Sequence, residues 1–377
     1  MDYKNFHKDF HLNGKRFDNV DELLSFSKTF SESLFSFLKD WFTDAQFIEV
    51  KTSGSTGKPK KILLKKKHMV NSALATGNYF NLHDKTTALL CLSPNYIAGK
   101  MMLVRALVLG WWLDVVAPNS NPLKNIDTEY DFCAMIPLQL YNSISQLYRI
   151  KKLIVGGGVV SNKLIQSLQG ISTKVYATYG MTETITHIAV RQLNGLELKV
   201  ENSNASKSIT LVTTKLSLQG APIAIGITWQ SLNYKTLPSI KISTDNRSCL
   251  VINAPKVSDK PVVTNDIVEL VSDTEFKWVG RYDTIINSGG IKLIPEQIEE
   301  KLSVIIGCRF FVTGIPDAIL GEKLVLLIES KNYSSALQFP SSLHKYEIPK
   351  ETFFIKKFIE TDTKKIDRGA TLKQFLK

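Results

Sequence analysis

The sequence has few cysteines, and they are placed far apart. Among its 377 residues are four cysteines, and none of them forms a CxxC pair. This spacing excludes a disulfide framework and a cysteine-rich zinc site, and it fits buried thiols in a reducing cytoplasm. The N-terminus is polar and charged, so it also lacks the apolar stretch of a signal peptide.

No apolar run is long enough to predict a membrane span. The most apolar segment covers residues 97–117, but Lys100, Arg105 and Asp114 interrupt it. A membrane-spanning helix needs about 20 predominantly apolar residues, so this segment predicts a buried helix followed by a strand. We therefore expect a cytoplasmic protein without stable membrane insertion.

Acidic residues are in the minority. The chain has 35 of them against 47 lysines and arginines, which gives a net charge of +12. A positive excess attracts anions such as nucleotides, coenzyme A or nucleic acid, but a lysine-rich solvated surface produces the same number. Arginine–aromatic interleaving and zinc-finger spacing are both absent, so we expect no nucleic-acid partner.

What the first half of the chain does contain is an alternation of apolar strand-like and helical segments. Strands are expected at 47–50, 87–92, 112–117, 131–136, 153–157 and 174–178, and helices at 21–41, 68–79, 97–109 and 162–168 and after Pro137. This alternation predicts an α/β fold with a parallel sheet flanked by helices. Beyond Glu183 the segments become shorter and β-rich, and from Tyr282 onward a small α+β unit is expected.

A loop rich in glycine, hydroxyl and lysine side chains follows the first of these strands. It reads Thr52-Ser53-Gly54-Ser55-Thr56-Gly57-Lys58-Pro59-Lys60. Glycines allow successive N–H groups to point into one concavity, while hydroxyls and lysines add donors and positive charge. The composition suits triphosphate oxygens, although Pro59 excludes a Walker loop. Taken alone, the stretch is equally readable as a flexible surface loop.

The loop resembles the phosphate-loop signature of the adenylate-forming superfamily, which includes acyl-CoA synthetases, peptide-synthetase adenylation domains and luciferases. Further signatures of that superfamily follow in order: Tyr179-Gly180-Met181-Thr182-Glu183, Thr-Asn-Asp at 264–266, Gly280-Arg281-Tyr282-Asp283, Ser288-Gly289-Gly290 and Thr-Lys-Lys-Ile-Asp-Arg at 363–368. The resemblance runs from about residue 47 to the end and is weakest between 190 and 240. Ordered motifs of this kind are far more specific than any one of them.

The resemblance implies two domains. Residues 1–281 would form a large N-terminal adenylating domain with parallel sheets, flanking helices and a β-rich subdomain. Residues 282–377 would form a small, mobile α+β domain that acts as a lid and swings about Asp283. Only 51 residues precede the phosphate loop, fewer than in typical members, so the first domain is expected to be shortened at its N-terminus.

The resemblance also assigns an ATP site with Mg²⁺. Tyr179 would stack on adenine, Asp266 and Arg281 would contact the ribose, Thr182 the α-phosphate, and Glu183 would hold Mg²⁺, which prefers oxygen ligands. The implied ATP- or AMP-binding residues are Thr52, Ser53, Gly54, Ser55, Thr56, Gly57, Lys58, Gly156, Gly157, Gly158, Tyr179, Gly180, Met181, Asp266 and Arg281.

The implied catalytic residues are Lys365, Thr182 and Glu183. Lys365 would neutralise charge where the substrate carboxylate attacks the α-phosphate. The family usually has glycine before this lysine, whereas this chain has Lys364, so two ammonium groups compete for the role. For the second half-reaction with coenzyme A, Ser288, Gly289 and Gly290 would line the channel of the thiol arm.

The acyl substrate is suggested by two further segments. Residues 95–106 and 286–292 are similar to short bacterial o-succinylbenzoate–CoA ligases of menaquinone synthesis. One carboxylate of such a substrate reacts, and the other needs polar partners because a buried unpaired carboxylate is costly. The acyl-pocket candidates are Tyr96, Lys100, Arg105 and His187. Arg105 is equally readable as the partner of an acid elsewhere, and His187 as a structural histidine.

Two other functions stay open from the sequence. The first is an adenylating ligase for another small carboxylate, with coenzyme A or a carrier-protein thiol as acceptor. The second is a nucleotide-binding relative that has lost turnover, because a fold alone does not establish activity. Both ligase functions imply a small-molecule carboxylate substrate. A homodimer is possible, but the sequence does not determine the oligomeric state.

Overall fold

The computed structural model describes most of the chain. Side chains are described for residues 5–51, 60–195, 233–330, 337–361 and 365–376, and the backbone alone for two short paired strands, β11 (Leu198–Val200) and β12 (Lys207–Ile209). The expected phosphate-loop residues 52–58 and the alternative lysine, Lys364, lie outside the described residues.

A 13-stranded sheet forms the centre of the molecule. Its central strands are parallel: β5 (Thr87–Leu90), β6 (Trp112–Val115), β7 (Tyr130–Met135), β8 (Ile150–Val155) and β9 (Lys174–Gly180). Beyond β9 the sheet continues antiparallel through β10 (His187–Gln192), β13 (Tyr234–Thr236), β17 (Glu275–Arg281), β16 (Val262–Leu270), β15 (Cys249–Asn253) and β14 (Lys241–Thr244). At the other edge β1 (His11–Leu12) and β2 (Lys15–Arg16) follow β6. The predicted α/β fold with a β-rich extension is confirmed.

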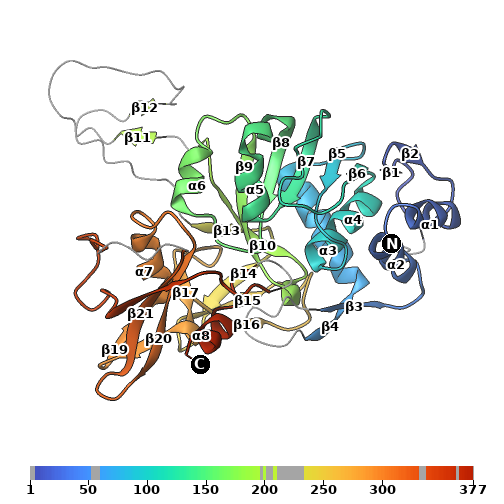
Figure 1. The fold of residues 1–377 in the computed structure, drawn as a ribbon. Helices are drawn as coiled ribbons and strands as arrows, with labels where there is room; N and C mark the ends of the chain where they lie inside the picture. Colours follow the sequence, from blue (N-terminus) through green and yellow to red (C-terminus); the bar gives the residue numbers. More distant parts are fainter. Residues whose placement is uncertain are drawn as a thin grey trace.

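Helices cover both faces of the parallel strands, as Figure 1 shows. Successive strand residues point to opposite faces, so Ala88 and Leu90 pack on one side while Leu89 packs on the other. The first side is covered by α3 (Lys66–Phe80) and α4 (Ile97–Leu109), and the second by α5 (Pro137–Ser143), η1 (Ile144–Arg149) and α6 (Asn162–Ser167). Burial on both faces explains why these strands are almost wholly apolar in sequence.

The expected single helix over residues 21–41 is two helices. α1 (Val20–Lys28) and α2 (Glu32–Trp41) are separated at Ser31, whose backbone is extended and whose Oγ accepts a hydrogen bond of 3.1 Å from the Leu34 amide. Serine is a favoured N-cap because this bond satisfies an amide that the first helical turn leaves unpaired. The apolar periodicity that suggested one helix continues across the break. A hairpin of β3 (Phe47–Lys51) and β4 (Lys61–Lys65) follows.

The C-terminal part has its own five-stranded sheet. It contains β18 (Ile286–Ser288), β19 (Ile291–Leu293), β20 (Phe310–Asp317), β21 (Gly321–Glu329) and β22 (Glu351–Ile355), with α7 (Pro295–Leu302) and α8 (Arg368–Phe375) beside it. A short turn, η3 (Tyr282–Thr284), joins it to β17 of the large sheet. In Figure 1 this unit lies at the opposite end of the molecule from α1 and α2. That residues 282–377 move as a lid stays a prediction.

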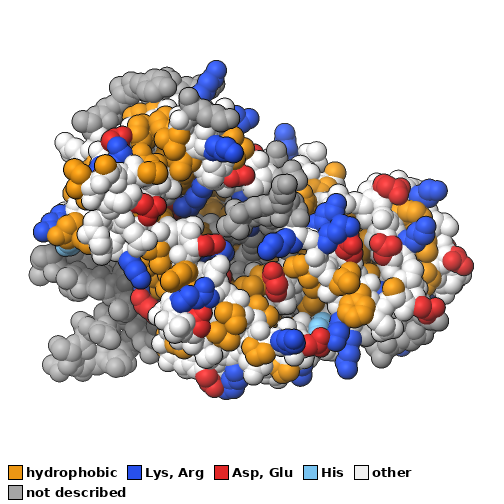
Figure 2. Space-filling model, turned by 90° about the horizontal axis from the view of Figure 1, so that it is seen from below, with side chains coloured by type: hydrophobic (Ala, Val, Ile, Leu, Met, Phe, Trp, Pro, Cys, Tyr) orange, Lys and Arg blue, Asp and Glu red, His pale blue; other side chains and the backbone are white. Residues whose placement is uncertain are grey.

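Charged side chains of both signs are spread over the face of the molecule that Figure 2 shows. In the view of Figure 2, lysines and arginines lie among acidic side chains rather than in one continuous basic patch. This distribution favours the solvated-surface explanation of the net charge. Among the described residues no helix is long and apolar enough to cross a membrane.

The packing of α4 gives a stability prediction. Leu103 is fully buried on α4, whereas Leu138 on α5 is 45% exposed. We expect Leu103→Ala to lower the free energy of unfolding by about 2–5 kcal/mol, because it leaves a cavity in the core. Leu138→Ala, the matched control, should change it by less than about 0.5 kcal/mol. Urea denaturation measures both, and equal losses would contradict the placement of α4.

Candidate active site

A buried carboxylate, Asp266 on β16, is contacted by polar side chains from two other strands. Tyr179, near the end of β9, donates its hydroxyl to Asp266 Oδ2 at 2.6 Å. From β17, Trp278 donates its indole N–H to Oδ1 at 3.2 Å, and Arg281 Nη1 lies 3.7 Å from the same oxygen. Burial and the neighbouring carboxylate raise the pKa of Tyr179 above its ordinary range, so the phenol stays protonated as a donor.

Arg281 joins this cluster to the turn that leaves the large sheet. Its Nε and Nη2 donate to the two oxygens of Asp283 at 2.8 and 2.7 Å. The hydrogen bond to Asp283 raises the pKa of Arg281, and such a two-point fork fixes the plane of the guanidinium. The structure thus brings the expected ribose residues, Asp266 and Arg281, into contact with the expected hinge residue.

Lys365 is buried, and it feels the charge of Arg281, which lies 84 positions earlier in the sequence. Burial is the main cause that lowers the pKa of Lys365, and the positive charge of Arg281 lowers it further. A hydrogen bond of 2.8 Å from the Thr361 amide to the Lys365 carbonyl holds its backbone. This lysine is therefore within electrostatic range of Arg281, one of the residues expected to bind the nucleotide.

The segment after β9 makes a compact turn that contains η2 (Thr182–Thr184). Gly180 is needed there, because a Cβ on it would lie 2.1 Å from the carbonyl oxygen of Thr186. Thr184 Oγ1 interacts with the amide and carbonyl of Met181, both at 3.1 Å, and with the carbonyl of Thr186 at 2.9 Å. This network leaves Thr182 half-buried and Glu183 exposed.

Glu183 has the chemistry that a Mg²⁺ site on ATP needs. Its carboxylate is exposed, and no ion pair joins it to any described residue. The described residues contain no group of three or more His, Cys, Asp or Glu that could enclose a metal. Mg²⁺ with nucleotides is typically held by one or two carboxylates together with phosphate oxygens and water. A lone exposed carboxylate next to Thr182 fits that pattern.

The glycine run after β8 presents bare backbone. Gly157 has a φ of +79°, a conformation that other residues rarely adopt, and both Gly157 and Gly158 are exposed. A Cβ on Gly156 would lie 2.7 Å from Thr178 Oγ1, one residue before Tyr179. A flat ring can approach such a backbone closely, so the three glycines fit the adenine role given to them.

Arg105 is buried on α4 without a carboxylate partner. It is 2% exposed, and its N–H groups donate to Thr76 Oγ1 at 3.3 Å, to Met102 Sδ at 3.6 Å and to Thr186 Oγ1 at 3.3 Å. All three acceptors are neutral, and no ion pair to Arg105 occurs among the described residues. Burial lowers the pKa of Arg105 to about 9, so it remains charged at neutral pH.

His187 lies at the start of β10 in the same region. It is 6% exposed, and its buried Nε2 has no hydrogen-bond partner among the described residues. Burial, and then the charge of Arg105, lower the pKa of His187 to about 3. The structure thus brings Arg105 and His187 together, with the imidazole neutral at physiological pH. A neutral ring can donate or accept one hydrogen bond but carries no charge toward a carboxylate.

The other two acyl-pocket candidates are Lys100 and Tyr96, and the structure gives them contacts other than Arg105. Lys100 Nζ lies 4.8 Å from the ring centroid of Phe37 on α2, and burial lowers the pKa of Lys100. A cation over an aromatic ring is already partly satisfied. Tyr96 is half-buried at the N-cap of α4, where its carbonyl accepts from the Lys100 amide at 3.1 Å. The structure therefore separates Lys100 from Arg105.

The expected thiol channel residues form a tight turn. Ser288 ends β18, and Gly289 and Gly290 have φ angles of +58° and +81°. The Gly289 amide donates to the Leu320 carbonyl at 2.9 Å. A Cβ on Gly290 would meet nothing within 4 Å, which leaves bare, accessible backbone at this turn.

Some residues of the site carried no motif signal. Arg105 donates hydrogen bonds to Thr76 on α3 and to Thr186 after η2. Ser72 on α3 shares a hydrogen bond with Thr186, and Trp278 donates one to Asp266. Thr186 sits three residues after Glu183, and its closeness to a signature was the one available hint. Hydroxyl groups inside a helix give no pattern that a single sequence could reveal.

Comparison with known proteins decides the family. A family model described as AMP-binding enzyme matches residues 51–218. The crystal structure of an acyl-CoA synthetase (AMP-forming)/AMP-acid ligase II-like protein from Dyadobacter fermentans is 35% identical, covers 93% of this chain and 97% of its own, and superposes with a TM-score of 0.56. This chain belongs to the AMP-forming acyl-CoA synthetases. Enzymes of this family are AMP-forming acid–thiol ligases that use ATP, Mg²⁺ and coenzyme A.

More distant relatives have a narrower name. A 2-succinylbenzoate–CoA ligase from Enterococcus faecalis is 24% identical over 333 residues, which are 84% of this chain and 67% of the relative. An o-succinylbenzoate coenzyme A synthetase from Bacillus subtilis, solved with ATP and magnesium, is 17% identical, covers 96% of this chain and 83% of its own, and has a TM-score of 0.69. At this identity the structural likeness shows the fold.

The turn at Gly180 gives a prediction for this acyl-CoA synthetase. Gly180→Ala must push Thr186 away, and an overpacked site of this kind costs about 1–3 kcal/mol. We expect at least a tenfold fall in ATP–pyrophosphate exchange, because the displaced segment carries Thr182 and Glu183. Gly307→Ala is the control, since a Cβ there meets nothing within 4 Å. An unchanged exchange rate in Gly180→Ala would contradict the geometry of the turn.

Proposed function

We propose that this synthetase is a cytoplasmic ligase for an aromatic dicarboxylate, most specifically an o-succinylbenzoate–CoA ligase of menaquinone biosynthesis. The observation that carries the substrate class is Arg105, a buried guanidinium whose described partners are all neutral. The names of the relatives at about a quarter identity agree with this substrate. A non-catalytic relative is disfavoured because Tyr179 and Arg281, both expected to bind the nucleotide, contact Asp266.

The first half-reaction takes place at the Asp266 cluster. ATP would lie with its adenine against Tyr179 and the glycines 156–158, and with its ribose hydroxyls donating to Asp266. Arg281 would contact the same sugar, and residues 52–58 would enclose the phosphates. The Tyr179–Asp266 bond of 2.6 Å fixes the carboxylate before the nucleotide arrives, so little orientation entropy is lost on binding.

Bond making occurs at the α-phosphorus of ATP. A carboxylate oxygen of the substrate attacks this phosphorus, the bond to the bridging oxygen breaks, and pyrophosphate leaves to give the acyl-adenylate. Thr182 would donate to the α-phosphate, and Lys365 would offset the charge that develops there. Glu183 would hold Mg²⁺, which supplies neutralisation of the phosphate oxygens when bound. The substrate is itself the nucleophile, so no side-chain nucleophile is needed.

The second half-reaction forms the thioester. The sulfur of coenzyme A attacks the acyl carbon, the carbon–oxygen bond to AMP breaks, and AMP leaves. We assign Ser288, Gly289 and Gly290 to the channel for the thiol arm, and Asp283 to the hinge that brings them in. Because Arg281 holds Asp283 by two hydrogen bonds, rotation at the hinge requires this fork to open or to move as a unit.

The far carboxylate of the substrate would bind Arg105. A planar guanidinium offers paired N–H donors that match a carboxylate, and in a buried place this contact is much stronger than in water. Lys100 is the weaker candidate because its ammonium already lies over Phe37. His187 is neutral, so its unpaired Nε2 suits an uncharged oxygen of the acyl group rather than its carboxylate.

Substrate selection can be measured directly. Pyrophosphate release with o-succinylbenzoate should exceed that with benzoate or a medium-chain fatty acid, and the product with coenzyme A should be the thioester. Arg105→Met should reduce turnover of o-succinylbenzoate at least about 100-fold, since truncating one partner of a buried charged pair costs about 2–5 kcal/mol. Benzoate turnover should stay within about threefold of the wild-type value.

The same variant separates binding from folding. A buried charge without an ionic partner destabilises the folded state, so Arg105→Met should leave the melting temperature unchanged or raise it. A clear fall in melting temperature would mean that Arg105 is structural. Preference of the wild type for a monocarboxylate would keep the ligase chemistry and overturn the dicarboxylate assignment.

The catalytic lysine has its own test. Lys365→Ala should slow acyl-adenylate formation about 10²–10³-fold while ATP binding changes little, because its contact belongs to the transition state. Lys364→Ala tests the competing ammonium, and Lys373→Ala, exposed on α8, serves as the neutral control. Rapid-quench measurement of the adenylate and equilibrium binding of ATP distinguish the two effects. Loss of ATP affinity with an unchanged rate of adenylation would exclude the role for Lys365.

A further inference from the structure

A strained turn at Ile185 lies between the nucleotide side and the Arg105 side of the site. Ile185 has φ +67° and ψ −65°, and the Thr186 amide donates to the Thr184 carbonyl at 2.8 Å. These angles and this bond define the rarer, strained form of the γ-turn. For a β-branched residue the conformation is an outlier that costs about 1–3 kcal/mol.

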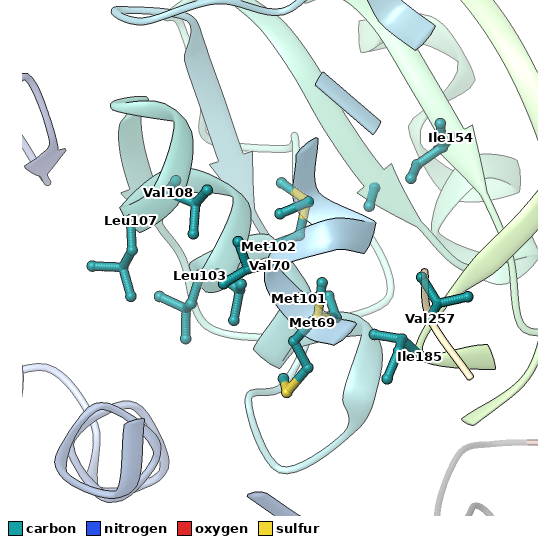
Figure 3. Close-up of a cluster of buried hydrophobic side chains, with 14 of the residues drawn as sticks. Met69, Val70, Met101, Met102, Leu103, Leu107, Val108, Ile154, Ile185 and Val257 are labelled. Carbon is teal, nitrogen blue, oxygen red and sulfur yellow. The ribbon is translucent and has the colours of Figure 1, made fainter. Parts of the chain in front are cut away.

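The surroundings hold Ile185 in this conformation from both sides. Its side chain is 1% exposed and belongs to the same buried hydrophobic cluster as Val257 (Figure 3). Before it, Thr184 Oγ1 is bound to Met181 and to the Thr186 carbonyl. After it, the Thr186 carbonyl packs against the backbone of Gly180, in the space that a Cβ on this residue would fill. A strained residue persists only when its neighbours determine its position in this way.

The turn decides where one hydroxyl points. Thr186 Oγ1 accepts from Arg105 Nη2 at 3.3 Å and shares a hydrogen bond of 3.0 Å with Ser72 Oγ. A relaxed backbone at Ile185, with negative φ, would redirect the chain just before Thr186 and take this hydroxyl away from Arg105. The guanidinium would then lose one of the neutral groups that fix its plane.

We propose that Ile185 is a positioning residue for substrate selection: its γ-turn presents Thr186 to Arg105 and so orients the guanidinium toward the far carboxylate of the substrate. This inference rests on the proposed dicarboxylate function. Because Thr182 and Glu183 directly precede the γ-turn, Ile185 also influences the separation between the adenylating end and the anchoring end of the site. A substrate of the correct length satisfies both ends together.

The test uses two truncations that differ only in backbone preference. Ile185→Ala removes the buried side chain and favours negative φ, whereas Ile185→Gly removes it but accepts φ +67° without strain. The ratio of kcat/KM for o-succinylbenzoate to that for benzoate should fall about tenfold in the alanine variant and stay within about threefold of wild type in the glycine variant. The KM for ATP should change little in both.

A packing role predicts the opposite order. Both variants lose the same buried contacts, and glycine adds flexibility, so glycine would then be at least as damaging as alanine. Equal losses, or a larger loss in Ile185→Gly, would overturn the proposal. A wild-type enzyme with no preference for the dicarboxylate would refute the proposed function itself, which is a distinct result because no variant is needed to see it.

Thr186 supplies a second pair of variants should the Ile185 variants fold poorly. Thr186→Val keeps the shape and removes the hydroxyl, and it should lower the same selectivity ratio about tenfold or more, because a hydrogen bond to a charged group is lost. Thr186→Ser keeps the hydroxyl and should remain within about threefold of wild type. A ratio unchanged in Thr186→Val, or equally low in Thr186→Ser, would contradict the positioning role.

Discussion

The carboxylate of Asp266 is the constraint on which the rest of the site depends. It lies 9% exposed on β16 and accepts hydrogen bonds from Tyr179 of β9 and Trp278 of β17. A buried carboxylate is stable only when such donors satisfy it, so the three strands cannot separate without leaving it unpaired. Arg281 extends the same network to Asp283, at the turn that leads into the C-terminal sheet.

Arg105, in contrast to Asp266, is a buried charge that its described partners do not neutralise. The described structure gives it neutral acceptors and no ion pair, although burying a charge in this way lowers the stability of the fold. A buried charge with a purely structural role is usually paired with an opposite charge of the protein. A buried charge that binds a ligand can lack such a partner until the ligand is bound. This cost in stability supports the proposal that an anion completes the site.

Much of the fold followed from local patterns. The helix over 97–109 and the strands of the parallel sheet were predictable because two-sided burial makes their sequences uniformly apolar. The break between α1 and α2 was not, because apolar periodicity continues through Ser31 and only its capping bond reveals the end of one helix. The motif residues were identified by resemblance, but whether Arg105 had an acidic partner depends on contacts between α3, α4 and the turn after β9. No single segment encodes those contacts.

The segment from Tyr179 to Thr186 unites these observations. Its first residue donates to Asp266, and its last residue receives a hydrogen bond from Arg105. Positive charge is present at both ends: the charge of Arg281 lowers the pKa of Lys365, and Arg105, which has no ion pair among the described residues, lowers the pKa of His187. Like charges brought together, or a charge left without an ion pair, raise the energy of the unliganded protein. In the proposed function, a phosphate near Lys365 and a carboxylate at Arg105 relieve both, and the segment from Tyr179 to Thr186 connects the two ends of the site.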